Sequence, residues 1–305
     1  MQTNRSILEI LSQTAVIFFF SGLLFGQDKP LLPDYIAANI SAPPAALELD
    51  SFYAKYTNAL GIPITSSGKV PDAALLVARD IVIHMLAKRP DIREAMVTGK
   101  YRVGIMALTE MTTDIPEHRN LKKPAPTAFN LTEAEKRNYD RIAKMTDKEY
   151  WDGRARGLGG RLTTCAEENL LGYPGTRYYG ENIFVHEFSH SIHRAIREVD
   201  PKLWEEVRQA YTDAMAKGLW KNQYGSTNYN EYWAEASQTW FWSNYEFADG
   251  DRKIETPNDL KQYDPKIYEL LSRVYPDHHI PMDIYHGKNI KPQPRRPAAK
   301  KESLP

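Results

Sequence analysis

Two histidines and a glutamate stand at metal-binding spacing in the second half of this 305-residue chain. His186 and His190 are four residues apart in a segment whose apolar residues recur every three or four positions, which predicts a helix. Both imidazoles then project from one face, about one turn apart, and can bind a single zinc ion. Glu187 leaves the helix about 100° away from His186, beside the metal, where a general base for a zinc-activated water belongs.

A second predicted helix supplies carboxylates. A hydrolytic zinc site needs a third protein ligand and one position left open for water. Glu231 and Glu235 are four residues apart on the face opposite a tryptophan-rich stripe, so Glu231 could reach the metal. Glu235 could accept a hydrogen bond from a ligand imidazole and fix its tautomer. Asn228 and Glu231 also match a helix capping box, so spacing alone leaves the role of Glu231 open.

Two stretches resemble the lethal-factor-like zinc metallopeptidases, the family of the C-terminal protease domain of anthrax lethal factor. They are His186-Glu-Phe-Ser-His190 and the segment Tyr224-Gly-Ser-Thr-Asn followed by Glu231-Tyr-Trp-Ala-Glu235-Ala. More distantly, they are similar to thermolysin-type zincins, which use glutamate as the third zinc ligand. The resemblance covers residues 100–275. It implies one zinc ion per chain, held by His186, His190 and Glu231.

The resemblance also implies catalytic roles. Glu187 would be the general base, Tyr224 would donate its hydroxyl to the oxyanion, and Glu235 would match the carboxylate behind a ligand histidine. In the family, a strand before the active-site helix pairs with the extended substrate, and residues 101–108 would correspond to it. His193 departs from the family pattern, and it lies too far along the helix axis to bind the same metal.

Periodicity elsewhere predicts a mostly helical α+β, zincin-like domain with a small sheet on one side of the active-site helix. The expected segments are helices at 51–60, 71–88, 90–97 and 132–146, a loop at 61–68 and a strand at 101–108. A single catalytic domain is expected over residues 27–286, with a helical N-terminal part at 27–99 and a catalytic core at 100–286. His278 and His279 are expected in a surface loop.

Both ends of the chain differ from this domain. Residues 1–26 carry a basic residue, a short apolar run and a final glycine, a layout typical of a signal peptide. The run is too short to span a bilayer comfortably, so we expect a secreted protein, extracellular or periplasmic, without a membrane span. Residues 287–305 are basic, rich in proline and poor in apolar residues, and are expected to be a disordered tail.

Composition narrows the possible partners. Lys and Arg together number 39, as do Asp and Glu, so no global positive field favours nucleic acid. The lone cysteine, Cys165, cannot form an intramolecular disulfide and is expected to be a small buried residue. The composition does not specify an oligomeric state.

These observations together predict a zinc-dependent endopeptidase that acts on a peptide or protein substrate. Two alternatives stay open from the sequence. One is a zinc amidase that hydrolyses a non-protein amide or cell-wall peptide, because the metal motif does not encode the substrate. The other is a non-catalytic secreted binding protein on the same scaffold, although the intact Glu187 argues against it.

Overall fold

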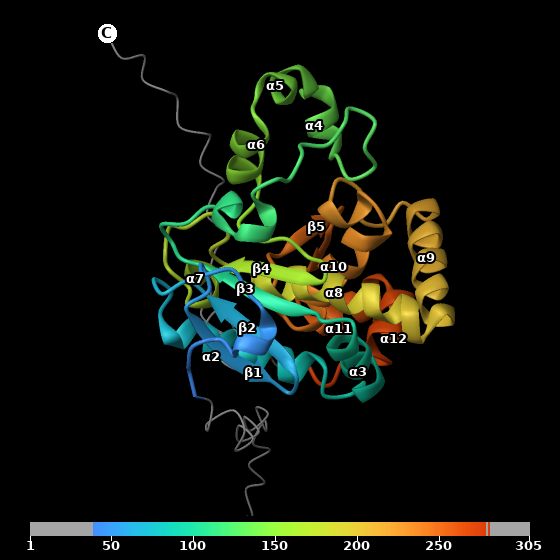
Figure 1. The fold of residues 1–305 in the computed structure, drawn as a ribbon. Helices are drawn as coiled ribbons and strands as arrows, with labels where there is room; N and C mark the ends of the chain where they lie inside the picture. Colours follow the sequence, from blue (N-terminus) through green and yellow to red (C-terminus); the bar gives the residue numbers. More distant parts are fainter. Residues whose placement is uncertain (1–38, 279, 281–305) are drawn as a thin grey trace, which may run out of the picture.

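The computed structural model describes residues 39–278 and residue 280, with helices around a four-stranded main sheet and a separate two-stranded sheet (Figure 1). The expected signal peptide at 1–26 and the expected tail at 287–305 lie outside the described residues, as does His279. Within the described range, no helix combines the length and apolar character needed to cross a membrane. The predicted mostly helical α+β class is confirmed.

The main sheet contains four strands in the spatial order β1-β2-β3-β4. β1 (Lys55–Ala59) and β2 (Ile62–Ser66) are antiparallel. β3 (Arg102–Met106) and β4 (Leu162–Ala166) continue the sheet in parallel with β2. β4 therefore forms the edge next to the helix that carries His186 and His190, while β3 lies inside the sheet.

The first two strands correct the sequence analysis, which predicted a helix at 51–60 and a loop at 61–68. They form a hairpin joined by Leu60 and Gly61, whose φ angles are 51° and 99°. A two-residue turn with both φ angles positive matches the right-handed twist of the paired strands. Such a turn usually has the sequence Asn-Gly or Asp-Gly. Leu60 stands in place of the Asn or Asp, so the sequence did not indicate a turn here.

The internal position of β3 corrects a second expectation. A strand was predicted at 101–108, and β3 confirms it, but β3 is hydrogen-bonded on both sides by β2 and β4. Its backbone therefore has no edge to offer an extended substrate. At the outer side of β4, Thr164 already forms an antiparallel bridge with Leu158.

Helices enclose the sheet. α2 (Asp72–Met85) and α3 (Pro90–Thr98) connect β2 to β3 and confirm the helices predicted at 71–88 and 90–97. α8 (Ile183–Val199) lies at the centre, against β4, α3 and α10 (Tyr229–Trp240). Phe184, Phe188 and Ile192 on α8 are fully buried, as their spacing predicts.

Three short helices form a projecting group above the sheet, drawn in green in Figure 1. They are α4 (Glu133–Arg137), α5 (Tyr139–Lys144) and α6 (Asp147–Arg154). The helical prediction for 132–146 is confirmed, with a break at Asn138. The remaining elements are η1 (Ala45–Leu47), η2 (Thr112–Asp114), η3 (Pro116–His118), α7 (Glu167–Leu170), α9 (Pro201–Ala216), η4 (Tyr224–Ser226), β5 (Phe247–Asp249), β6 (Arg252–Ile254), α11 (Pro257–Tyr263) and α12 (Pro265–Ser272).

One main cluster of buried hydrophobic residues extends from Ala59 to Ile280 and includes residues of the sheet, α8 and α10. Cys165 is fully buried in β4, as predicted for a small packed residue. Because the same core contains both the sheet and the two central helices, it fixes where the polar faces of α8 and α10 meet.

Two glycines allow the chain after α6 to lie directly on α8. A Cβ atom at Gly159 would come within 2.6 Å of the His190 Cβ and 2.8 Å of the Glu187 carbonyl oxygen. A Cβ atom at Gly157 would lie 2.9 Å from the Thr164 carbonyl oxygen and 3.1 Å from the Glu187 Cγ. This close approach excludes any larger side chain unless α8 moves.

We therefore expect Gly159→Ala to destabilise the fold by about 1–3 kcal/mol, as overpacking of a tight contact does. Urea denaturation of the metal-free protein measures this change without a contribution from metal binding. Gly153→Ala in α6 is the matched control, since no atom lies within 4 Å of its added methyl group. It should leave stability unchanged or raise it by up to about 1 kcal/mol. Equal midpoints for Gly159→Ala and the wild type would refute the contact.

Candidate metal centre

Three potential ligand atoms converge where α8 meets α10. Nε2 of His186 lies 3.1 Å from Oε2 of Glu231 and 3.2 Å from Nε2 of His190. Nε2 of His190 lies 3.3 Å from the same Glu231 oxygen. Among the residues that the structure describes, these three form the one group of His, Cys, Asp and Glu side chains with metal-binding geometry.

The donor set fits a zinc ion. Ligand atoms at ~2.0–2.1 Å from a tetrahedral zinc are about 3.3 Å from one another, close to the three separations found here. Two imidazole nitrogens and one carboxylate oxygen also form a known hydrolytic zinc set, with a fourth position for water. The predicted ligands His186, His190 and Glu231 are therefore brought together by the fold.

Local helix signals set the positions of these side chains. Asn182 caps α8, its Oδ1 accepting a hydrogen bond from the Val185 N–H at 3.1 Å. Asn228 caps α10 in the same way, its Oδ1 accepting from the backbone N–H groups of Asn230 and Glu231. Asn228 is thus a helix cap, as the sequence allowed, while the Glu231 carboxylate points to the histidines.

The carboxylate of Glu231 is well suited to bind a cation. Burial acts to raise its pKa, but the neighbouring His190 and His186 outweigh burial and lower the pKa well below its ordinary value. Glu231 therefore stays ionised although its side chain is only 15% exposed. A buried carboxylate needs a cationic or hydrogen-bonding partner, and the two imidazoles face it directly.

The other nitrogen of His186 contacts a residue that the sequence analysis did not identify. Nδ1 of His186 lies 2.9 Å from Oε1 of Gln238, which is fully buried. The Nε2 group of Gln238 donates to the Asn182 carbonyl oxygen at 3.1 Å, which fixes the amide orientation. Gln238 therefore holds the tautomer of His186 that leaves Nε2 free to bind a metal.

The sequence analysis predicted that Glu235, not Gln238, orients the His186 imidazole. Its Oε1 lies 3.5 Å from Nδ1 of His186, farther than Gln238, and its Oε2 accepts a hydrogen bond from Asn244 at 2.9 Å. Burial raises the pKa of Glu235, and His186 opposes the rise. Glu235 lies behind the metal group, and its orienting role stays a prediction.

Glu187 stands beside the three converging side chains. Burial raises the pKa of its carboxyl, His186 and His190 lower it, and Glu231 raises it again. A Cβ atom at Gly157 would lie 3.1 Å from the Glu187 Cγ, so the chain after α6 passes close to this side chain. This arrangement suits a group that exchanges a proton next to the metal position.

Tyr224 begins η4, and its ring centroid lies 6.1 Å from that of His186. Burial and the Glu231 carboxylate raise the pKa of Tyr224, whereas the positive charge of the nearby Arg154 opposes the rise. The hydroxyl therefore remains protonated near neutral pH and can donate a hydrogen bond. Arg154 is a neighbour that the sequence analysis did not predict.

A buried carboxylate positions η4 and α10 relative to each other. Oδ2 of Asp264 accepts hydrogen bonds from the Tyr232 hydroxyl at 2.6 Å and from Nε1 of Trp220 at 3.0 Å. Trp220 precedes η4 and contacts Gly225, and Tyr232 follows Glu231. The network thus connects the segment that carries Tyr224 to the helix that carries Glu231.

Two other histidines of the described chain, His193 and His278, lie outside the metal group. His193 is buried, and its ring stacks on Trp233 with centroids 5.2 Å apart. Burial lowers the pKa of His193 to about 3, so the ring is neutral and packs between α8 and α10. His278 lies 3.0 Å from the Trp240 carbonyl oxygen and 3.2 Å from the Tyr268 hydroxyl.

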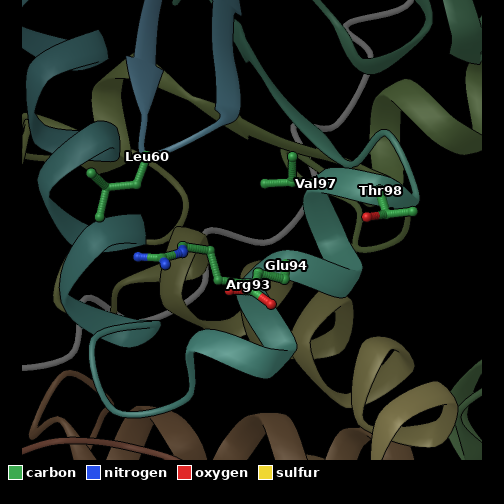
Figure 2. Close-up of a pocket in the computed structure, with 5 residues that line it drawn as sticks. All are labelled: Leu60, Arg93, Glu94, Val97 and Thr98. Carbon is green, nitrogen blue, oxygen red and sulfur yellow. The ribbon is translucent and has the colours of Figure 1, made fainter.

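A separate shallow hollow lies between the β1–β2 turn and α3 (Figure 2). Its lining residues are Leu60, Arg93, Glu94, Val97 and Thr98. None of these residues belongs to the candidate metal group, and the hollow contains no histidine or cysteine. It therefore adds no chemistry to the site.

Comparison with known proteins adds one likeness. No protein-family model matches this chain, and no curated protein matches it. The solved structure of the Pro-Pro endopeptidase from Paenibacillus alvei is similar, with 19% sequence identity and a TM-score of 0.43. The match covers 70% of this chain and 97% of that one. A likeness of this degree carries no conclusion about function.

The Gln238 contact gives a direct test of the site. We expect Gln238→Met to weaken zinc affinity by about 10–100-fold, because His186 loses the acceptor that orients it. Competition with a chromophoric chelator measures the affinity, and melting temperature checks folding. Gln238→Glu keeps an acceptor and should restore part of the affinity. Gln209→Met, at an exposed position on α9, is the control. Unchanged affinity in Gln238→Met would contradict the assigned contact.

Proposed function

We propose that this chain is a zinc-dependent endopeptidase of the lethal-factor-like type. The observation that carries the proposal is the convergence of Nε2 of His186, Nε2 of His190 and Oε2 of Glu231 within 3.1–3.3 Å of one another. The position of Glu187 beside them adds a proton acceptor to the site. A metal site with an adjacent carboxylate can hydrolyse a peptide bond through a metal-activated water.

Each residue has a defined task in this proposal. His186, His190 and Glu231 hold the metal, and Gln238 orients His186. A zinc ion bound there would supply a Lewis acid that makes water more acidic and polarises the substrate carbonyl. Glu187 accepts a proton from the attacking water and delivers it to the leaving amine as the C–N bond breaks. Tyr224 donates a hydrogen bond to the carbonyl oxygen as negative charge develops on it.

The two alternative functions make different demands on these residues. A zinc amidase for a non-protein amide would use the same residues on another substrate. A binding protein on the same scaffold would not need Glu187, yet Glu187 is present and half-buried beside the metal ligands. Secretion rests on residues 1–26 alone and is proposed on that basis.

A quenched fluorogenic peptide library, assayed with zinc and with a chelator, tests the function. We expect cleavage that the chelator abolishes and added zinc restores, because the ligands are His186, His190 and Glu231. Hydrolysis of cell-wall peptides alone would favour the amidase. Absence of any cleavage by fully zinc-loaded protein would count against the endopeptidase.

Three substitutions separate the roles. Glu187→Gln should retain about one zinc per chain and lose nearly all activity, since its amide cannot accept the proton. Tyr224→Phe should retain zinc and lose about 10²–10³-fold in kcat. His190→Ala should lose the metal. Elemental analysis and steady-state kinetics measure these outcomes.

The matched control is Glu198→Gln, which changes an exposed carboxylate on the same helix. It should behave as the wild type in zinc content and rate. A Glu187→Gln protein that cleaves peptides at the wild-type rate would refute the proposed proton transfer.

A further inference from the structure

Arg156 lies in the connection between α6 and β4, and its side chain is almost fully buried. Only 11% of the side chain is exposed, and only 8% of that of its partner, Glu168 in α7. Nε of Arg156 donates to Oε1 of Glu168 at 2.8 Å, and Nη2 donates to Oε2 at 3.0 Å. This is the bidentate geometry of a strong arginine–carboxylate pair, so the guanidinium is fixed in position and orientation.

The same guanidinium also binds the loop after β3. Nη2 donates to the Ala107 carbonyl oxygen at 3.1 Å, and Nη1 donates to the Glu110 carbonyl oxygen. Arg156 therefore joins the loop after β3, α7 and its own connection to β4. A buried ion pair is weak evidence for added stability, because both charges lose their hydration. The position that the pair fixes is the better explanation for it.

That position is the start of residues 157–160, which we call the glycine segment. At the far end of the segment, the Gly160 N–H donates to Oγ of Ser191 at 3.2 Å, and the Ser191 hydroxyl donates to the Gly160 carbonyl oxygen at 2.7 Å. In the middle, Leu158 and Thr164 exchange backbone hydrogen bonds at 3.2 and 2.8 Å. The segment is thus held at its end by α8, in its middle by β4, and at its beginning by the anchored arginine.

The glycine segment passes over the turn of α8 that carries two of the proposed functional side chains. A Cβ atom at Gly157 would lie 3.1 Å from Cγ of Glu187, and one at Gly159 would lie 2.6 Å from Cβ of His190. A shift of the segment would therefore change the space available to both side chains. A misplacement of about 1 Å at a reacting group can cost about 10²-fold in rate.

We propose that Arg156 is a positioning residue for the metal centre, which holds the glycine segment at the distance from α8 that orients His190 and Glu187. The inference rests on the metal site of the proposed endopeptidase and adds to it a residue that acts through its neighbours. Side chains in such a site need a surrounding layer of fixed residues, because a metal ligand that is free to move binds less tightly.

The test compares Arg156→Met with Arg79→Met in the full chain. Arg79 in α2 forms another buried ion pair, with Asp80 at 3.0 Å, and donates to the Asn58 carbonyl oxygen in β1. Both variants should have a lower melting temperature, since each leaves a buried carboxylate without its partner. Only Arg156→Met should weaken zinc affinity, by about 10-fold in competition with a chromophoric chelator, and change the visible spectrum of the cobalt-substituted protein.

Kinetics with the best peptide from the fluorogenic library provide a second measurement. In Arg156→Met, kcat should fall by about 10–10²-fold with little change in KM, because the orientation of the reacting groups is lost and substrate binding is not. Arg156→Lys keeps the charge but not the bidentate contact, so it should show the same losses to a smaller degree, even if Arg156→Met fails to fold. Arg79→Lys is its control and should match the wild type in zinc affinity and kcat.

Two results would overturn the inference. One is wild-type zinc affinity and kcat in Arg156→Lys, and the other is equal losses of zinc affinity in the Arg156 and Arg79 variants. The chelator and cobalt measurements need no substrate, so they separate this inference from the proposed activity. A wild type that binds zinc but cleaves no peptide would refute the endopeptidase, whereas the predicted change in zinc affinity would still support the positioning role.

Discussion

The contact between α8 and α10 is the constraint on which the rest of the site depends. Each helix alone carries only part of a ligand set, two imidazoles on one and a carboxylate on the other. Their apolar faces share one core, and Nε1 of Trp233 donates to the Ser189 carbonyl oxygen at 3.2 Å, which fixes one helix against the other. The stacked, neutral His193 fills the same interface. Polar side chains are therefore forced together at a point where only a shared cation or hydrogen bonds can compensate for their burial.

The remainder of the fold surrounds this contact with supports. The edge strand β4 packs against α8, and the segment after α6 lies so close to α8 that a Cβ atom at Gly159 would clash with His190. On the other helix, the Asp264 network connects η4 to α10. Hydrolysis of an amide requires such preorganisation, because donors that must reorient during the reaction stabilise its transition state poorly.

Sequence reasoning predicted the site well where the spacing is local. His186 and His190 lie one helical turn apart, so their spacing alone predicts this pair of ligands. Spacing left the role of Glu231 open, and only the family resemblance implied it as the third ligand. Gln238 and Arg154 could not be predicted, because only tertiary packing brings them to His186 and Tyr224. In the fold, long periodic helices such as α2 were predicted, whereas the hairpin at Leu60-Gly61 and the short strand β4 were not. A five-residue strand contains too few alternations of apolar and polar residues to be identified from the sequence. Its pairing is decided by partners that are distant in the sequence.

X-ray absorption at the zinc edge tests the central claim most directly, since it reports on the metal without any substrate. The convergence of the three ligands predicts about four nitrogen or oxygen neighbours at ~2.0–2.1 Å, with the more distant scattering of two imidazole rings. Replacing Glu231 with alanine should remove one oxygen neighbour of the zinc or prevent zinc binding altogether. Neither the wild type nor the variant should show scattering from a sulfur atom at ~2.3 Å. A protein that binds no zinc, or one whose zinc has the same neighbours in the Glu231→Ala variant, would contradict the convergence of the two helices on a common ion.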